Sequence, residues 1–369
     1  MDAKREGWYN VRVSEKRENY AAAKKLVAAS RRILISGHLS PDGDSLGSMI
    51  ALARLLRNAG FEAFATADLN ALGKPGFLEG VGDIVPVRKL RKLARRSRGE
   101  GGFDLFIAVD CGAFERMPPE VRPVAEKLPT ICIDHHVTNT QFGNVSIVDP
   151  DASSTGELIW RIAKWNEWKL DRTIAEALWV AMITDSGRFA YDSTKPGTLR
   201  AAGDLLKYGV RTSYINDVIY GSFSRKAIEL KRIAWRSLHV WKNRKVAEVT
   251  LTRDDFREVR GTKADAEDVI EIPRSVARNE IALFFYQIPD RTKEVRCSIR
   301  TRGDWDATVL AGKFGGGGHR KASGCTIKAT LAQAKRQMRA AVKDMLKGAC
   351  RRTMRLPAIP IPAKSAPTA

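Results

Sequence analysis

The first half of the chain alternates short apolar runs with longer segments in which apolar residues recur at helical spacing. The runs "RILISG", "FEAFAT", "FDLFIAVD" and "TICID" have the length and composition of buried strands. Segments of helical periodicity lie around them: "AAAKKLVAASRR", "SLGSMIALARLLRNAG", "STGELIWRIAKW" and "TIAEALWVAMIT". Gly60 closes the second of these segments, and glycine commonly follows the last residue of a helix. Apolar strands separated by helices predict a parallel, doubly wound α/β sheet.

The second half has a different pattern. Residues 196–240 are helical in pattern and basic, which is typical of a linker. Beyond them, "VAEVTLT", "ARNEIALFFYQIP" and "KEVRCSIRT" predict the strands of a smaller α/β unit. We therefore predict one domain at 15–195, a helical linker at 196–240 and a second domain at 241–350. The Pro- and Ala-rich tail at 351–369 has no core pattern, so we expect it to be disordered.

The charge of the chain favours anionic partners. Its 369 residues, enough for two domains, include 63 Lys and Arg against 42 Asp and Glu, a net charge of +21. Such a field attracts nucleic acids, nucleotides or an anionic membrane surface, although a basic surface kept for solubility would have the same composition.

The insert at 88–98 is the most basic stretch. Val87, Leu90 and Ala94 suggest an amphipathic turn on a surface loop, and a nucleic-acid contact is the alternative.

The cysteines and the absence of long apolar stretches indicate a cytoplasmic protein. Five cysteines are scattered and form no CxxC pair: Cys111, Cys132, Cys297, Cys325 and Cys350. That pattern is typical of a reducing compartment, and it indicates neither a disulfide framework nor a zinc knuckle. The first ten residues lack the apolar run of a signal peptide, and no stretch approaches the roughly 18 apolar residues of a membrane span.

The loop "GHLSPDGDSLGS" is the first candidate site. It carries His38, Asp42 and Asp44 between a predicted strand and a predicted helix. An EF-hand is excluded because Leu46 and Ala53 stand where oxygen ligands are needed. A P-loop is excluded because no Gly-Lys-Ser/Thr follows. Taken alone, this loop favours the simpler interpretation of an Asp-rich turn that caps a helix.

Further polar residues follow other apolar segments: Asp110 in "IAVDCG", Asp134, His135 and His136 in "IDHHVTN", and Asp185 in "MITDSGRF". Because ligands of open α/β sheets bind outside the carboxyl ends of the strands, we expect these side chains to converge. Adjacent strand residues point to opposite faces, so the two histidines are expected to have different roles. Histidine and carboxylate ligands without thiolate favour Mn²⁺ or Mg²⁺ over structural zinc. So many clustered anions suggest two metal ions, which together can act as a clamp for phosphoryl hydrolysis.

These motifs resemble a known family. "HLSPDGDSLGS", "VDCG", "DHHVTN" and "ITDSGRF" occur in the order of the four motifs of the DHH phosphoesterases, and "GGGGHRKASGC" is similar to the glycine-histidine motif of the DHHA1 domain. The resemblance extends from about residue 15 to 350. Chain length and the GGGGH ending look most like the NrnA-like group of nanoRNases (oligoribonucleases) and pAp phosphatases. RecJ-type exonucleases are usually longer, and manganese pyrophosphatases end in a different domain.

The resemblance implies two Mn²⁺ ions, with Mg²⁺ as the alternative, and separate roles for the residues of the first domain. One metal ion would be held by His38, Asp42 and Asp110. The second would be held by Asp44, Asp110, His135 and Asp185, so that Asp110 bridges the two ions. His136 would face the scissile phosphate and either stabilise its charge or protonate the leaving oxygen, and Asp134 would orient a neighbouring imidazole.

In the second domain, the glycines of "GGGGH" offer backbone N–H groups that no Cβ obscures, an arrangement suited to an anion. The resemblance implies that this domain binds the other phosphate or the 3′ nucleotide of the substrate through Arg300, Gly316, Gly317, Gly318 and His319. Two further features have simpler explanations. We expect Ser153, Ser154 and Thr155 to cap the following helix, and Arg188 is equally a phosphate contact or a plain surface residue.

Together these features predict hydrolysis of very short RNA or DNA oligonucleotides to 5′ mononucleotides, and of pAp to AMP. An end-binding pocket beside a metal site would favour dinucleotides and pAp over long polymers. A cyclic-dinucleotide phosphodiesterase acting on c-di-AMP or pApA is the alternative enzyme. The net charge also allows a non-catalytic nucleic-acid-binding protein, although such a protein has no need of clustered acids. A homodimer is left open.

Overall fold

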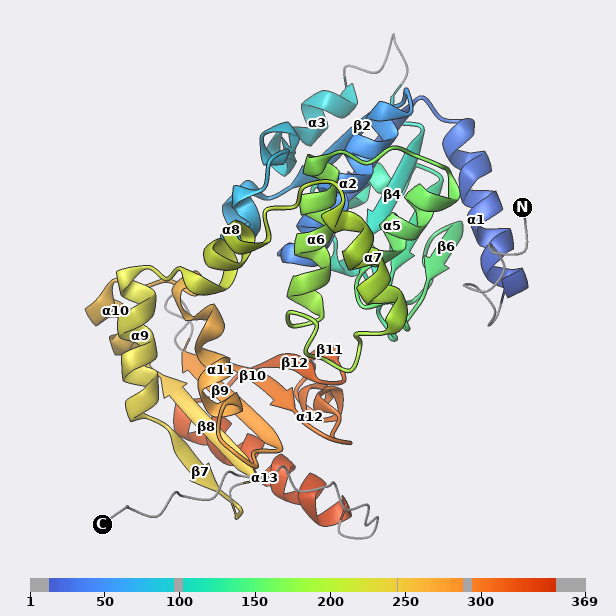
Figure 1. Ribbon diagram of the computed structural model, residues 1–369. Coiled ribbons are helices and arrows are strands. Elements are labelled where there is room, and N and C mark those ends of the chain that lie inside the picture. The colour runs from blue at the N-terminus through green and yellow to red at the C-terminus, as the bar shows by residue number, and fades with distance from the viewer. Residues whose placement is uncertain (1–12, 96–101, 244, 288–293, 350–369) are drawn as a thin grey trace, which may run out of the picture. The chain divides into compact units, whose positions relative to one another are not determined.

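The computed structural model divides the chain into two compact units, residues 1–222 and 223–369, which are described separately (Figure 1). It describes residues 13–95, 102–243, 245–287 and 294–349. The division falls within the segment for which the sequence predicts a linker. The predicted tail at 351–369 and residues 96–98 of the basic insert lie outside the described residues.

Unit 1 is built on a six-stranded sheet in which all neighbouring strands are parallel. The strands are β1 (Arg32–Ser36), β2 (Glu62–Ala67), β3 (Val85–Pro86), β4 (Leu105–Val109), β5 (Thr130–Asp134) and β6 (Val145–Val148). Their order in the sheet is β3-β2-β1-β4-β5-β6. The direction of winding therefore reverses between β1 and β4, the point at which ligands of such sheets bind. The predicted doubly wound parallel sheet is confirmed.

Helices cover both faces of this sheet, because side chains from successive positions of a strand enter opposite cores. Ile33 and Ile35 of β1 belong to the larger core, whereas Leu34 belongs to the core on the other face. The larger core includes residues of α2 (Gly43–Asn58), α5 (Thr155–Trp165), α6 (Arg172–Asp185) and α7 (Pro196–Leu206). The opposite core includes residues of α3 (Val87–Arg95) and α4 (Arg122–Ala125). The remaining α-helices among the described residues of the unit are α1 (Val13–Ala28), which packs beside β6, and α8 (Thr212–Asn216).

Two glycines allow α2, α5 and α6 to approach one another closely. A Cβ on Gly47 would lie 2.2 Å from the carbonyl oxygen of Ala177, and a Cβ on Gly156 would lie 2.4 Å from the Cβ of Ala181. Neither distance can be accommodated without movement of the backbone or of a short side chain. This close packing brings the beginnings of α2 and α5 and the end of α6 to the carboxyl edge of the sheet.

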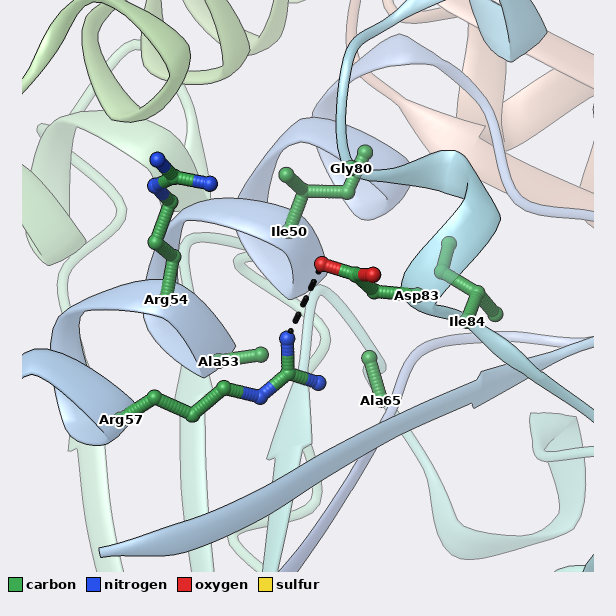
Figure 2. Close-up of a pocket in the computed structure, with 8 residues that line it drawn as sticks. All are labelled: Ile50, Ala53, Arg54, Arg57, Ala65, Gly80, Asp83 and Ile84. Carbon is green, nitrogen blue, oxygen red and sulfur yellow. Dashed lines mark hydrogen bonds and ion pairs between the residues drawn. The ribbon is translucent and has the colours of Figure 1, made fainter.

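The basic segment that follows β3 is helical. It forms α3, in which Leu90 is fully buried, instead of the amphipathic turn that the sequence favoured. On the opposite face, a small pocket lies between α2 and the short helix η4 (Val81–Asp83), where Arg57 pairs with Asp83 at 3.2 Å (Figure 2). None of the predicted site residues lines this pocket.

Unit 2 contains a mixed six-stranded sheet of order β11-β12-β10-β9-β8-β7, in which only β8 and β9 are parallel among the described strands. The strands are β7 (His239–Trp241), β8 (Val246–Leu251), β9 (Ile281–Gln287), β10 (Val295–Thr301), β11 (Gly317–His319) and β12 (Ala322–Ile327). One face packs on α12 (Ala307–Gly312) and α13 (Leu331–Ala349). The other packs on α9 (Arg225–Arg236), α10 (Arg253–Val259), η8 (Ala264–Ile270) and α11 (Glu271–Arg274).

One buried acid ties the last helix of unit 2 to the sheet. Glu248 of β8 is inaccessible to solvent, and its carboxylate accepts hydrogen bonds from Arg339 Nε at 2.9 Å and Trp241 Nε1 at 3.2 Å. Lys335 Nζ lies 3.1 Å from the same carboxylate.

Within the described parts of the chain, no helix combines the length and apolarity needed to cross a bilayer.

Candidate metal centre

The predicted residues of unit 1 come together where the sheet changes direction. His38 follows β1 and Asp110 follows β4, and these two strands are neighbours. His38 Nε2 lies 3.5 Å from an oxygen of Asp110 and 3.8 Å from an oxygen of Asp42. Asp42 is the N-cap of α2, and its side chain accepts hydrogen bonds from the backbone N–H groups of Asp44 and Ser45. His38, Asp42 and Asp110 could therefore hold one cation.

A second group forms around His135, directly after β5. Its Nε2 atom lies 2.9 Å from Asp185, 3.6 Å from Asp44 and 3.8 Å from Asp110, measured to the nearest carboxylate oxygens. The other ring nitrogen, Nδ1, lies 3.3 Å from the carbonyl oxygen of Ala152. A carbonyl can only accept, so Nδ1 carries the hydrogen and the lone pair of a neutral ring is on Nε2, among the carboxylates. Additional positive charge stabilises that arrangement, and Asp44, His135 and Asp185 could hold a cation.

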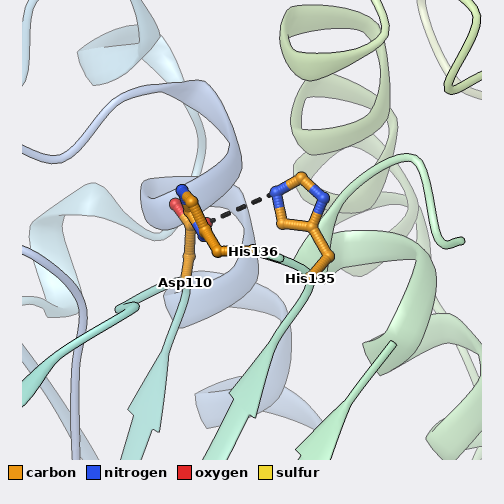
Figure 3. A group of neighbouring side chains, drawn as sticks. All are labelled: Asp110, His135 and His136. Carbon is orange, nitrogen blue, oxygen red and sulfur yellow. Dashed lines mark ion pairs between the residues drawn. The ribbon is translucent and has the colours of Figure 1, made fainter. Parts of the chain in front are cut away.

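Asp110 lies between these two groups. Figure 3 shows its side chain coming from the end of β4 toward the rings of His135 and His136, which come from the end of β5. The backbone of Asp110 is in the left-handed region, with φ of 51°. Non-glycine residues adopt this conformation rarely, and it concentrates at functional sites. It turns the chain abruptly after the strand and keeps this buried carboxylate at the sheet edge.

The adjacent histidines both lie near Asp110, but their rings have different nearest partners: Asp185 for His135 and Asp134 for His136. His136 Nδ1 lies 2.7 Å from Asp134 Oδ1, an atom that also accepts the backbone N–H of His135 at 2.9 Å. The second carboxylate oxygen of Asp134 accepts a hydrogen bond from Asn139 Nδ2 at 2.5 Å. Sequence reasoning missed Asn139, which stands within "DHHVTN" five residues after the aspartate. Its own carbonyl oxygen accepts the backbone N–H of Gln141, which fixes the orientation of the amide.

The electrostatics of the cluster fit a divalent cation. Burial and the charges of Asp110 and Asp185 raise the pKa of Asp44 well above its usual value. Burial alone would lower the pKa of His38, but hydrogen bonds to Asp110 and Asp42 raise it to about 10. The pKa of His135 is also raised, because Asp185 outweighs burial. Each of these shifts means that the cluster favours additional positive charge, which either protons or metal ions can supply.

The carboxylate of Asp44 is held by the beginning of α5. Its two oxygens accept the backbone N–H groups of Thr155 at 2.7 Å and Gly156 at 2.9 Å, and Ser48 Oγ donates at 3.2 Å. Ser154 caps α5 by accepting the N–H of Glu157, so that part of the predicted capping is confirmed. The additional contact of Thr155 and Gly156 with Asp44 could not be read from the sequence, because 111 residues or more separate the partners.

Beyond Asp185 the chain makes a left-handed turn. Three successive residues, Gly187, Arg188 and Phe189, have φ between 57° and 62°. The guanidinium of Arg188 lies over the ring of Tyr220, 4.7 Å from its centroid. Arg188 is exposed, and this stacking on an aromatic ring fixes its side chain.

In unit 2, the predicted glycine-rich loop is partly a strand. Gly317, Gly318 and His319 form β11, an edge strand that pairs with β12 alone among the described strands. Ala322 of β12 pairs with His319 on one side and with Arg300 of β10 on the other, so the three backbones form one row across the sheet. Gly316 precedes the strand, and a Cβ there would lie 2.3 Å from the carbonyl oxygen of Gly324. The side chain of His319 lies outside the described part of the structure.

Comparison with known proteins shows the family to which the chain belongs. Residues 32–182 match the model of the DHH family, N-terminal domain, and residues 255–348 match that of the DHHA1 domain. The bifunctional oligoribonuclease and PAP phosphatase NrnA of Thermus thermophilus is 30% identical over 335 residues, which cover 88% of this chain and 93% of that protein. The chain belongs to the DHH/DHHA1 phosphoesterase family, among its NrnA-like members. It is accordingly a hydrolase.

Other similar proteins differ in the share of their own length that is matched. The protein of the same name from Bacillus subtilis is 27% identical over 80% of this chain and 89% of its own length. The cyclic-di-AMP phosphodiesterase GdpP of Geobacillus thermodenitrificans is 24% identical over 89% of this chain but only 49% of its own length. Among solved structures, an exopolyphosphatase-related protein from Bacteroides fragilis superposes with a TM-score of 0.80 and 25% identity, covering 90% of this chain and 98% of that one.

Proposed function

We propose that this hydrolase cleaves very short oligonucleotides to 5′ mononucleotides and pAp to AMP, using two divalent metal ions, Mn²⁺ in preference to Mg²⁺. The observation that carries the proposal is the cluster of carboxylates and imidazoles at the β1/β4 edge of the sheet. Its combination with a DHHA1 domain, over nearly the full length of proteins named oligoribonuclease and PAP phosphatase, supports the substrate class.

The residues divide into two metal groups in this proposal. One ion is assigned to His38, Asp42 and Asp110, and the other to Asp44, Asp110, His135 and Asp185. The distances support this division, since His38 Nε2 lies near Asp42 and Asp110. His135 Nε2 lies near Asp44, Asp185 and the shared Asp110. The ions, when bound, would act as Lewis acids on the phosphoryl oxygens. The absence of thiolate from the ligand set favours manganese or magnesium over structural zinc.

The remaining residues of the cluster act on the substrate. We assign to His136 the stabilisation of charge on the scissile phosphate, or the protonation of the leaving oxygen. Its Nδ1 atom is held by Asp134, so the ring keeps one orientation with Nε2 directed away from that carboxylate. In unit 2, we assign to Arg300 and the Gly316–His319 segment the binding of the other phosphate of the substrate. The common row of Arg300 and His319 across the sheet supports a shared role.

A panel of substrates tests the proposal. Purified full-length protein is incubated with Mn²⁺ or Mg²⁺ and either pAp, pApA, RNA of two to ten nucleotides, or c-di-AMP, and products are separated by chromatography. We expect mononucleotides from the shortest RNAs, AMP from pAp, and no turnover by Asp110→Ala. Intact pAp and intact dinucleotides, with the wild type and Asp110→Ala indistinguishable, would contradict the proposal.

The same panel decides between the alternatives. The match to the GdpP protein favours c-di-AMP or pApA as a second substrate class, although the match covers about half of that protein. Faster turnover of c-di-AMP than of pApA or pAp would favour this cyclic-dinucleotide phosphodiesterase. Salt-sensitive binding of long RNA without metal-dependent turnover would favour a binding protein instead.

A further inference from the structure

A buried carboxylate just outside the metal cluster has no assigned role. Glu157 lies in the first turn of α5 and is inaccessible to solvent. One of its oxygens accepts three hydrogen bonds: from the backbone N–H of Ser153 at 2.9 Å, from Ser153 Oγ at 2.8 Å and from Thr198 Oγ1 at 2.8 Å. The other oxygen pairs with Arg161, one turn along the helix. Glu157 thus joins the loop before α5 to α7.

Arg161 extends these contacts to the beginning of the same loop. Its Nη1 atom donates to Asp149 at 2.7 Å, and its Nη2 atom donates to Glu157. The backbone N–H of Asp149 donates to the carbonyl of Asp134, at the end of β5. Glu157 and Arg161 therefore hold segment 149–156 at both of its ends.

The opposite side of segment 149–156 contacts the metal cluster. Ala152 provides the carbonyl that receives His135 Nδ1, and Thr155 and Gly156 provide the N–H groups that hold Asp44. Both contacted residues belong to the group Asp44, His135 and Asp185. Thr155 Oγ1 also donates to Asp110, the acid that both groups share, at 3.4 Å. By contrast, His38 and Asp42, which belong to the other group alone, make no hydrogen bond to this segment among the described residues.

We propose that Glu157 and Arg161 are positioning residues that set one of the two metal sites, that of Asp44 and His135, by holding segment 149–156. The inference rests on the metal assignment of the proposed function and deepens it. A displaced segment would move two ligands that come from different elements, the start of α2 and the end of β5. A Gln at position 157 cannot restore the contacts, because its NH₂ group would face either Arg161 or the donors of Ser153.

The prediction is selective loss of one metal site. Full-length apo-protein is titrated with Mn²⁺ by calorimetry and equilibrium dialysis. Wild type should bind two ions, and Glu157→Gln should bind one of them roughly 10-fold more weakly while the other changes less than about 2-fold. Glu176→Gln is the matched control: Glu176 is equally buried and paired with an arginine, Arg211, but it does not touch segment 149–156. It should lower stability and leave both sites intact.

Asp42→Asn identifies the site that is lost. This change should weaken metal binding by the His38 group. Its combination with Glu157→Gln should weaken both sites, whereas two changes that act on the same site would weaken that site alone. If Glu157→Gln fails to fold, Arg161→Gln, which is partly exposed, takes its place with the same expected result.

The outcomes distinguish an error in the metal assignment from an error in the role of Glu157. If the wild type does not bind two Mn²⁺ ions, the proposed metal function itself is wrong. If the wild type binds two and Glu157→Gln binds both equally well, the positioning role is refuted. Equal weakening of both sites, or the same weakening by Glu176→Gln, would mean that Glu157 is only a structural residue, which also refutes it.

Discussion

The hydrogen bond between Asp134 and His136 offers the most direct test of how the adjacent histidines divide their work. Asp134→Asn keeps the size of the side chain but removes its charge. Oδ1 of Asp134 accepts from His135 N and His136 Nδ1, while Oδ2 accepts from Asn139. An amide can satisfy only one of these two sides, because its NH₂ group meets a donor on the other.

The size of the effect follows from that lost contact. A hydrogen bond to a charged group contributes about 1.5–3 kcal/mol. If this energy holds the His136 ring in the orientation used in the transition state, its loss lowers kcat roughly 10- to 100-fold, since about 1.4 kcal/mol corresponds to a tenfold change in rate. The two metal groups do not include Asp134, so the affinity for Mn²⁺ should change less than about 3-fold.

Initial rates with pApA at saturating Mn²⁺ measure kcat and KM, and equilibrium dialysis measures the bound metal. Asp104→Asn is the control, because Asp104 precedes the other end of β4 and, among the described residues, accepts from the backbone of Arg31 and Arg32 alone. It should retain wild-type kcat. The reasoning is refuted if Asp134→Asn retains full kcat, or if it loses Mn²⁺ to the same extent as activity.

Three further predictions concern other contacts. His135→Ala should chiefly weaken Mn²⁺ binding, whereas His136→Ala should slow turnover with metal retained; equal metal loss in dialysis would contradict this division. Burial would raise the pKa of Glu248, but the hydrogen bond from Arg339 and the charge of Lys335 lower it below the usual 4.5. The ionised Glu248 therefore stabilises the folded protein fully above about pH 5, and this contribution is lost as pH falls through the lowered pKa. The unfolding free energies of wild type and Glu248→Gln should then converge in acid. A constant difference in urea titrations from pH 7 to pH 3 would be inconsistent with this. Gly47→Ala should destabilise the protein by about 1–3 kcal/mol in urea, because the new Cβ meets a backbone carbonyl; unchanged stability would contradict the close packing of α2 on α6.

The sequence predicted the fold class and the convergence of the site for one physical reason. In a parallel sheet, the polar residues that follow buried strands lie at one edge, so His38, Asp110 and Asp134 could be placed without knowing the strand order. The order itself, which puts β1 next to β4, depends on contacts between distant segments. The strand order in the structure determines which of the predicted strand ends are neighbours.

Features that depend on long-range partners were not predictable. Glu157 has the sequence context of an ordinary acid in the first turn of a capped helix, and only Thr198 on another helix reveals why it is buried. The short strand β6 has only four residues, too few for a clear alternation. The many basic residues of α3 favoured a solvent-exposed turn, whereas the segment is a helix whose Leu90 packs in the core. Likewise, Gly317 and Gly318 form a strand only because β12 is beside them.

The residues of the metal cluster are dispersed along the chain, from His38 to Asp185. Neither of the two ligand groups, that of His38 and that of Asp44, is complete until β4 has formed beside β1 or α6 has packed against α2. Binding of a divalent ion therefore reports on the assembled unit and cannot occur on a nascent fragment of it. It also links the folded population to metal supply: an ion present at 100 times its dissociation constant would add about 2.7 kcal/mol to the stability of unit 1. Depletion of the divalent ion would then lower the folded population of the enzyme as well as its turnover.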